Sequence, residues 1–229
     1  VMLIATLLVA LGHAGQQRPV GVVAPLIAGA FIALTGVLLV ADLKQPWRFH
    51  YLLTRPNTGS WLVRGAWILG AFAALVGVWL VAGVADAPML LRWLALPVGA
   101  AAAGAAGYTA FLFGQCEGRD LWQSPLLLPM LLAQAVVAGA AGWSLLDLVL
   151  DVPERRAIDI AFLAGLAAVG LLLAAELSAR GPRSVELATL ELTRGERARQ
   201  FWLGGVGAGL VAPATLVAIA LATGTTSPW

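Results

Sequence analysis

Two side chains able to take part in proton-coupled chemistry stand near the ends of long apolar runs. Asp42 ends one run, and Tyr108 lies about two turns before the end of another. A carboxylate and a phenol near one membrane surface suit a quinone head group, because quinone reduction adds protons as well as electrons to its two oxygens. Arg64, which opens a third run, completes the candidate quinone site.

Each of these residues also has a purely structural interpretation. Asp42 could anchor a helix end by pairing with Lys44, Arg48 or Arg64, since an ionisable group at membrane depth usually has a partner or a task. Tyr108 could donate a hydrogen bond to a neighbouring carbonyl, as buried hydroxyls normally do. The residues alone leave both interpretations open.

The composition predicts how these residues are positioned. With 60% hydrophobic and only 11% charged residues, the protein cannot bury its apolar surface in one soluble globule, so it is predicted to be a polytopic membrane protein. We expect an all-α transmembrane helical bundle and a single domain over 1–229, with about seven visible spans at 1–13, 19–42, 60–83, 90–114, 125–147, 157–177 and 200–222. The first run is too short to cross a hydrocarbon core of about 30 Å, so it is interpreted as the second half of a helix. Gly99, Ala103 and Gly107 are predicted to allow close helix packing.

The polar segments divide into two groups if every run crosses the membrane. Segments 43–59, 115–124 and 178–199 would lie on one face, called side B here, and 14–18, 84–89 and 148–156 on the other, side A. Side B carries ten basic residues, against four on side A: Lys44, Arg48, Arg55, Arg64, Arg119, Arg180, Arg183, Arg194, Arg197 and Arg199, against Arg18, Arg92, Arg155 and Arg156. This bias favours a cytoplasmic side B by the positive-inside rule, or a docking surface for an acidic partner. The sequence does not separate the two explanations.

Other titratable residues are weaker candidates. His50 in segment 43–59, and Glu176 and Asp147 near the ends of two spans, are candidates for a proton path, but a solvated histidine and charges that snorkel at helix ends are the favoured interpretations. His13 is expected at side A, away from Asp42, and is excluded from the quinone site. One cysteine, Cys116, and two histidines argue against a haem or a metal centre held within the protein. Nothing in the sequence predicts a nucleic-acid partner, whereas lipid contact is expected throughout.

Three sequence segments carry a resemblance to a known family. DLKQPWRFHYLLTRPNTGSWLVRGAW, which starts at Asp42, is similar to the DLGRP…RF…L…RPN…SW…GAW signature of the NrfD-like family of membrane subunits. GYTAFLFGQCEGRDLWQSP (107–125) and FWLGGVGAGLVAP (201–213) resemble later segments of the family in the expected order. The resemblance extends over nearly the whole sequence.

The resemblance implies a haem-free bundle that binds an exchangeable quinone, menaquinone or ubiquinone, near the membrane surface. It implies a four-cluster, ferredoxin-like iron–sulfur subunit beside side B and a separate catalytic subunit, of the molybdopterin type or another, so that this protein alone performs no substrate chemistry. The family's Asp of DL-x-x-P and its fourth-helix Tyr match Asp42 and Tyr108. Two departures are Lys44-Gln45 in place of Gly-Arg and the lack of a counterpart for the final helix of the eight-helix family core, so the domain is expected to be incomplete at both ends.

Docking and orientation follow from the same resemblance. Arg48, Arg55, Arg119 and Asp120 are expected to face the iron–sulfur subunit, and Arg64 with Asp42 and Arg119 with Asp120 are candidate ion pairs there. The expected location is the bacterial cytoplasmic membrane, with side B outward, against the positive-inside rule. Two alternatives are a secondary transporter, which is disfavoured because no inverted repeat is visible, and a purely structural anchor. The terminal substrate is not readable from the sequence.

Overall fold

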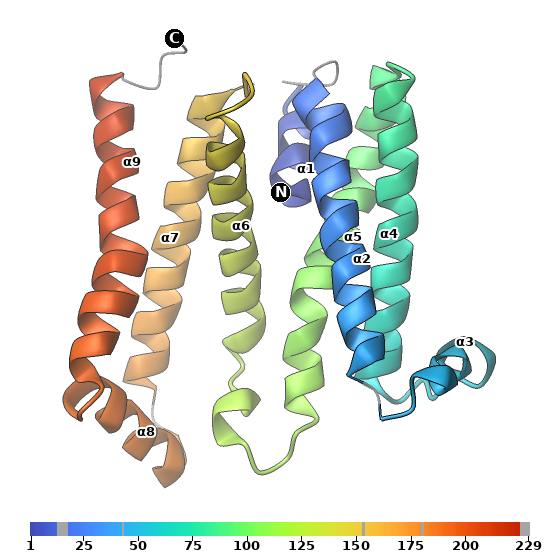
Figure 1. The fold of residues 1–229 in the computed structure, drawn as a ribbon. Coiled ribbons are helices and arrows are strands. Elements are labelled where there is room, and N and C mark those ends of the chain that lie inside the picture. Colours follow the sequence, from blue (N-terminus) through green and yellow to red (C-terminus); the bar gives the residue numbers. More distant parts are fainter. Residues whose placement is uncertain (13–17, 43, 153, 180, 225–229) are drawn as a thin grey trace.

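The computed structural model describes residues 1–229 except 13–17, 43, 153, 180 and 225–229, and except the side chains at 48, 52, 53 and 121. Within the described part the protein is a bundle of long, roughly parallel helices (Figure 1). No strand occurs among the described residues, which confirms the all-α prediction.

Six helical segments are long and apolar enough to cross a membrane. The spans are η1 (Pro19–Val23) continued by α2 (Ala24–Ala41), α4 (Trp61–Val84), α5 (Pro88–Gly114), α6 (Leu127–Leu146), α7 (Arg155–Ser178), and η4 (Gln200–Val211) continued by α9 (Ala212–Thr223). They match the predicted runs to within a few residues. The first predicted run forms only the nine-residue α1 (Met2–Ala10), which begins part-way along the bundle (Figure 1).

Two of the spans begin with π-helical segments, η1 and η4, and each leads directly into an α-helix whose second residue is a proline, Pro25 or Pro213. Proline has no N–H and its ring crowds the carbonyl four residues earlier. The wider π turn relieves that crowding, because the N–H of Ala24 is donated to Pro19 O and that of Ala212 to Gly207 O. The apolar runs therefore continue through both prolines without a break in the helix.

The core lies where α1 packs against α5 and α6. Trp79 of α4 and Trp143 of α6 are fully buried, and each indole N–H has a backbone acceptor: Val20 O for Trp79 and Val1 O for Trp143, both at 3.0 Å. A buried Trp needs such a partner because an unpaired polar group inside a protein is costly. The two tryptophans therefore tie α4 to η1 and α6 to α1.

Glycines bring the helices close together, as predicted for the Gly/Ala-rich spans. A Cβ at Gly107 would lie 2.7 Å from Leu128 of α6, and one at Gly99 would lie 3.2 Å from Thr6 of α1. At the crossing of η1 and α4, Gly21 and Gly83 meet backbone to backbone, which leaves no room for a side chain. These contacts confirm close packing as the role of Gly99 and Gly107.

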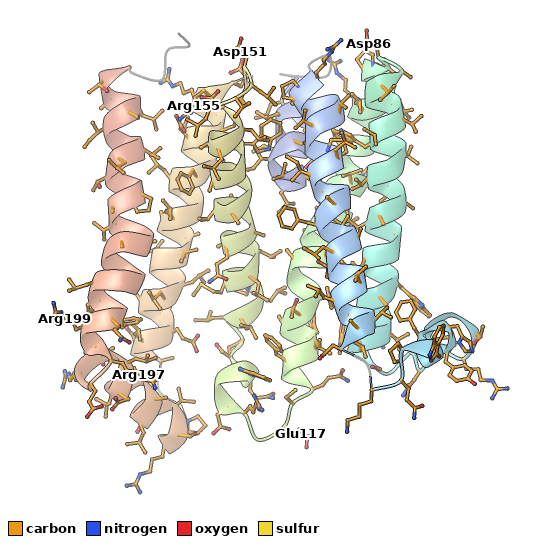
Figure 2. The ribbon with its side chains drawn as sticks, in the orientation of Figure 1. Asp86, Glu117, Asp151, Arg155, Arg197 and Arg199 are labelled. Atoms are coloured by element: carbon orange, nitrogen blue, oxygen red, sulfur yellow. The ribbon has the colours of Figure 1, made fainter. Side chains whose placement is uncertain are left out.

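The polar segments gather at the two ends of the bundle, as predicted. Asp86, Asp151 and Arg155 lie at the side A end, and Glu117, Arg197 and Arg199 lie at the side B end (Figure 2). Side B also carries short helices in the segments predicted as loops: η2 (Pro46–His50), α3 (Tyr51–Thr54) and η3 (Asp120–Gln123).

The prediction of segment 178–199 as a loop was wrong, because it contains the amphipathic helix α8 (Arg183–Arg194). This helix lies across the side B end, oblique to the spans (Figure 1). The 3.6-residue period of RSVELATLELTR could have revealed it.

Candidate functional site

Tyr108 is held in place by the shape of the neighbouring helix. Its ring lies directly over Gly65 of α4, where an added Cβ would clash with two ring carbons. Any other residue at position 65 would push the ring away. Tyr108 stands six residues before the end of α5, about 9 Å from its side B terminus at 1.5 Å per residue. The close approach of α4 and α5 therefore fixes the ring near the side B surface.

The hydroxyl of Tyr108 has no hydrogen-bond partner among the residues that the structure describes, although its ring is half buried. Asp42 stands at the side B end of α2, is exposed, and forms no ion pair within the described part of the protein. Both groups lie at the same end of the bundle, and both are free to interact with a ligand. The structure shows no direct contact between them.

Arg64 joins an aromatic cluster in the first turn of α4. Its guanidinium lies 4.9 Å from the centre of the Trp61 ring, and that ring stacks on Phe111 of α5 at 4.3 Å. The Arg64 Nε–H is donated to Thr58 O at 2.7 Å. A cation over an indole face is stabilised by the ring quadrupole. Arg64 is thus held one position before Gly65, on which Tyr108 rests.

Gln115, just past the end of α5, clamps this cluster. Its amide oxygen accepts the N–H of Trp61 at 3.0 Å, and its amide nitrogen donates to Gly59 O at 3.3 Å. The start of α4 is therefore joined to the end of α5 by side chain–backbone bonds as well as by the stacked rings. A backbone N–H in the first turn of a helix has no partner within the helix, and Gln115 supplies one.

A second cluster orders the segment 115–124. Trp122 stacks on Phe113 at 4.6 Å, and the Arg119 guanidinium lies 4.2 Å from the Trp122 ring centre. The amide of Gln123 donates to Gly114 O and Cys116 O. Asp120 accepts a hydrogen bond from Ser184, which attaches this segment to α8.

Both candidate ion pairs are absent from the described part of the structure. Arg64 lies over Trp61 rather than beside Asp42, and Arg119 lies over Trp122 while Asp120 binds Ser184. The predictions paired each arginine with an acid close in sequence or at the same helix ends. In each case a tryptophan three residues away, before Arg64 or after Arg119, offers a flat face within easier reach.

The remaining side B candidates lie at the surface. His50 is exposed, shares a 2.7 Å hydrogen bond with Trp47 O through Nδ1, and lies 4.2 Å from the Tyr51 ring. Arg55 caps the end of α3 and is exposed. The side chain of Arg48 and all of His13 lie outside the described residues.

Glu176 and Asp147 lie at opposite ends of the bundle. Glu176, near the side B end of α7, accepts a 2.7 Å hydrogen bond from the hydroxyl of Ser124. Asp147, at the side A end of α6, pairs with Arg155, whose Nε also donates to Asp159 at 3.3 Å. The two carboxylates therefore do not share one site.

Three features were missed by the sequence reasoning. Asp159 is 2% exposed, with one oxygen lacking a partner among the described residues, and its four-residue spacing from Arg155 was the available signal. Gln115 was missed because its bonds join positions 54 and 56 residues apart, which no local pattern records. The Gly65–Tyr108 contact depends on how two helices cross, so it had no signal in either helix alone.

The sequence profile of the family described as polysulphide reductase, NrfD matches residues 1–227. The chain belongs to the NrfD family. Among curated NrfD-type relatives, a polysulfide reductase subunit of Wolinella succinogenes is 29% identical over 220 residues, which represent 85% of this chain and 68% of that protein. No solved structure matches the sequence significantly. The resemblance noted from the sequence is confirmed, and this NrfD protein is a multi-pass helical membrane protein by its six apolar spans.

Proposed function

We propose that this NrfD protein is the quinone-reactive membrane subunit of a multisubunit oxidoreductase. It would pass electrons between the membrane quinone pool, menaquinone or ubiquinone, and the clusters of an adjacent four-cluster iron–sulfur subunit. A further catalytic subunit would convert the terminal substrate. The observation that carries the proposal is the packing of Tyr108 on Gly65, which fixes the phenol while leaving its hydroxyl without a partner in the described structure.

The proposed roles follow from the chemistry of a quinone. Two electrons and two protons convert a quinone into a quinol, so its two oxygens need hydrogen-bond donors and a proton-exchanging group nearby. The Tyr108 hydroxyl can donate to one oxygen. Asp42, exposed at the end of α2, can exchange a proton with the surrounding water, and the positive charge of Arg64 can stabilise developing negative charge on the head group.

The proposed iron–sulfur partner would dock on side B. Electron transfer requires a cluster close to the quinone, and Asp42, Arg64 and Tyr108 all belong to the side B ends of their helices. Arg48, Arg55, Arg119 and Asp120 belong to the segments that cover this end. We also propose that side B faces outward from a bacterial cytoplasmic membrane.

The proposed proton path is limited by position. His50 and Glu176 lie at side B and can exchange protons with the water outside the proposed quinone site. Asp147 lies at the other end and is held by Arg155. A path that uses Asp147 would have to cross the whole bundle.

Replacement of Tyr108 by Phe tests the proposed function. The variant keeps the ring on Gly65 and removes one hydrogen bond, worth about 0.5–1.5 kcal/mol in typical cases. Quinone-dependent turnover of the assembled complex should therefore fall, while reduction of the iron–sulfur subunit by a soluble donor should not change.

Tyr51→Phe is the matched control, because Tyr51 is the only other tyrosine of the sequence and lies exposed in α3. It should leave quinone turnover unchanged. Equal turnover in wild type and Tyr108→Phe would remove Tyr108 from the site and leave the proposed function without its main support.

A further inference from the structure

A groove of about 720 Å³ separates α1 from α5 in the side A half of the bundle. Its floor consists of small side chains of α5, among them Ala95, Gly99 and Ala100. Its rim consists of Leu7 and Leu11 of α1 and Leu96 of α5, all of which are exposed, Leu96 to 81%. Exposed leucines on a transmembrane span contact lipid tails, so the groove opens toward the bilayer.

The position of Arg92 places the head of this groove at the membrane boundary. Residues 93–113 of α5 carry no charge, and at 1.5 Å per residue they span roughly 31 Å, close to the hydrocarbon thickness of about 30 Å. Arg92 directly precedes this stretch and lines the groove. From Arg92 to Ala100 the groove follows α5 for about 12 Å into the hydrocarbon layer.

Arg92 is the group in the groove that can bind an anion. It is exposed and has no ion pair or hydrogen bond within the described part of the protein. The only hydroxyl in the lining is that of Thr6, which donates to Leu3 O at 2.9 Å and so is already satisfied. The groove thus presents one cation at the head-group level and apolar surface below it.

We propose that this groove binds one anionic phospholipid, with its phosphate on Arg92 and an acyl chain between α1 and α5. A guanidinium suits a phosphate because its N–H groups can bind two oxygens at once. The adjacent Trp93, 76% exposed at the same level, suits the interfacial layer in which lipid head groups lie. The site is separate from Tyr108 and does not depend on the proposed quinone chemistry.

The test uses the complete complex in nanodiscs that contain equal amounts of phosphatidylglycerol and phosphatidylethanolamine. After transfer to detergent, native mass spectrometry counts the lipids retained and identifies their class. The preference for phosphatidylglycerol should fall about fivefold in Arg92→Gln, the factor for about 1 kcal/mol per cation at an anionic surface. Arg92→Lys should keep most of the preference, because it keeps the charge.

Two further variants separate this site from the general lipid layer. Ala100→Trp fills the lower groove and should remove the retained lipid although Arg92 is intact. Arg156→Gln removes an exposed side A arginine that does not line the groove and should change nothing. Equal losses in Arg92→Gln and Arg156→Gln, or retention unaffected by Ala100→Trp, would show an unspecific lipid layer only and overturn the proposal.

Discussion

Removal of Arg155 should destabilise the α6–α7 hairpin, because Asp159 would be left as a buried charge without a counter-ion. Asp159 is 2% exposed, and Arg155 Nε lies 3.3 Å from its Oδ1. Its other oxygen already lacks a partner among the described residues. Arg155 also pairs with Asp147, so one cation serves two carboxylates at the side A end of the hairpin.

The size of the effect follows from this geometry. Two unit charges 3.3 Å apart interact by about 5 kcal/mol at an effective dielectric constant of about 20. The Arg155 side chain is 35% exposed, so water screens part of that interaction. Removal of one partner from a buried pair typically costs about 3–5 kcal/mol, and the exposure of Arg155 places the expected loss for Arg155→Met near 3 kcal/mol.

Unfolding of the purified protein in mixed micelles, titrated with a denaturing detergent, would measure the loss. Arg156→Met is the matched control, since Arg156 is the next residue of α7 and is exposed; it should change stability by less than about 0.5 kcal/mol. The double variant Arg155→Met/Asp159→Asn should recover at least half of the loss, because it removes the unpaired charge. Equal stability of the two Arg→Met variants, or no recovery in the double variant, would refute the argument.

Three further predictions concern side B. Gly65→Ala should displace the Tyr108 ring, cost about 1–3 kcal/mol of stability as overpacking does and lower quinone turnover; Gly70→Ala, on the same helix with nothing within 4 Å of its Cβ, should do neither, and equal behaviour of the two would contradict the packing argument. Gln115→Ala should cost about 1 kcal/mol by removing the bonds to Trp61 and Gly59, which the same titration measures; an unchanged midpoint would mean that water replaces both bonds. A cysteine at Thr58 in a Cys116→Ser background, without the partner subunit, should react with an impermeant reagent in intact cells, whereas one at Ala87 should not; the reverse pattern would place side B in the cytoplasm.

The sequence was sufficient to predict the spans because each is specified by its own residues. The apolar runs set the lengths of α4, α5, α6 and α7 within a few residues, and the glycines at 99 and 107 indicated close packing. A membrane span satisfies its backbone hydrogen bonds internally, so its existence depends little on its neighbours. The polar end of the bundle is different, because its structure depends on contacts between segments distant in sequence.

The candidate site shows where local reasoning stops. Asp42, Arg64 and Tyr108 were correctly placed at one end of the bundle, but the partners of Arg64 were not. Ion pairing was a reasonable expectation from residue type alone. Which acceptor an arginine uses depends on the last few ångströms of geometry, and at both Arg64 and Arg119 a tryptophan face lies closer than the expected carboxylate.

These two arginines also bear on the meaning of the side B charge. The positive-inside rule counts basic residues by their effect on insertion, yet a basic residue can be retained for another reason. Arg64 is bound to Thr58 O and Trp61, and Arg119 rests on Trp122, so each has a structural role in the folded side B surface. On the side A end, Arg155 is likewise engaged, with Asp147 and Asp159. The charge bias is therefore partly a record of local packing, and it weighs less against an outward side B than the bare count of ten against four suggests.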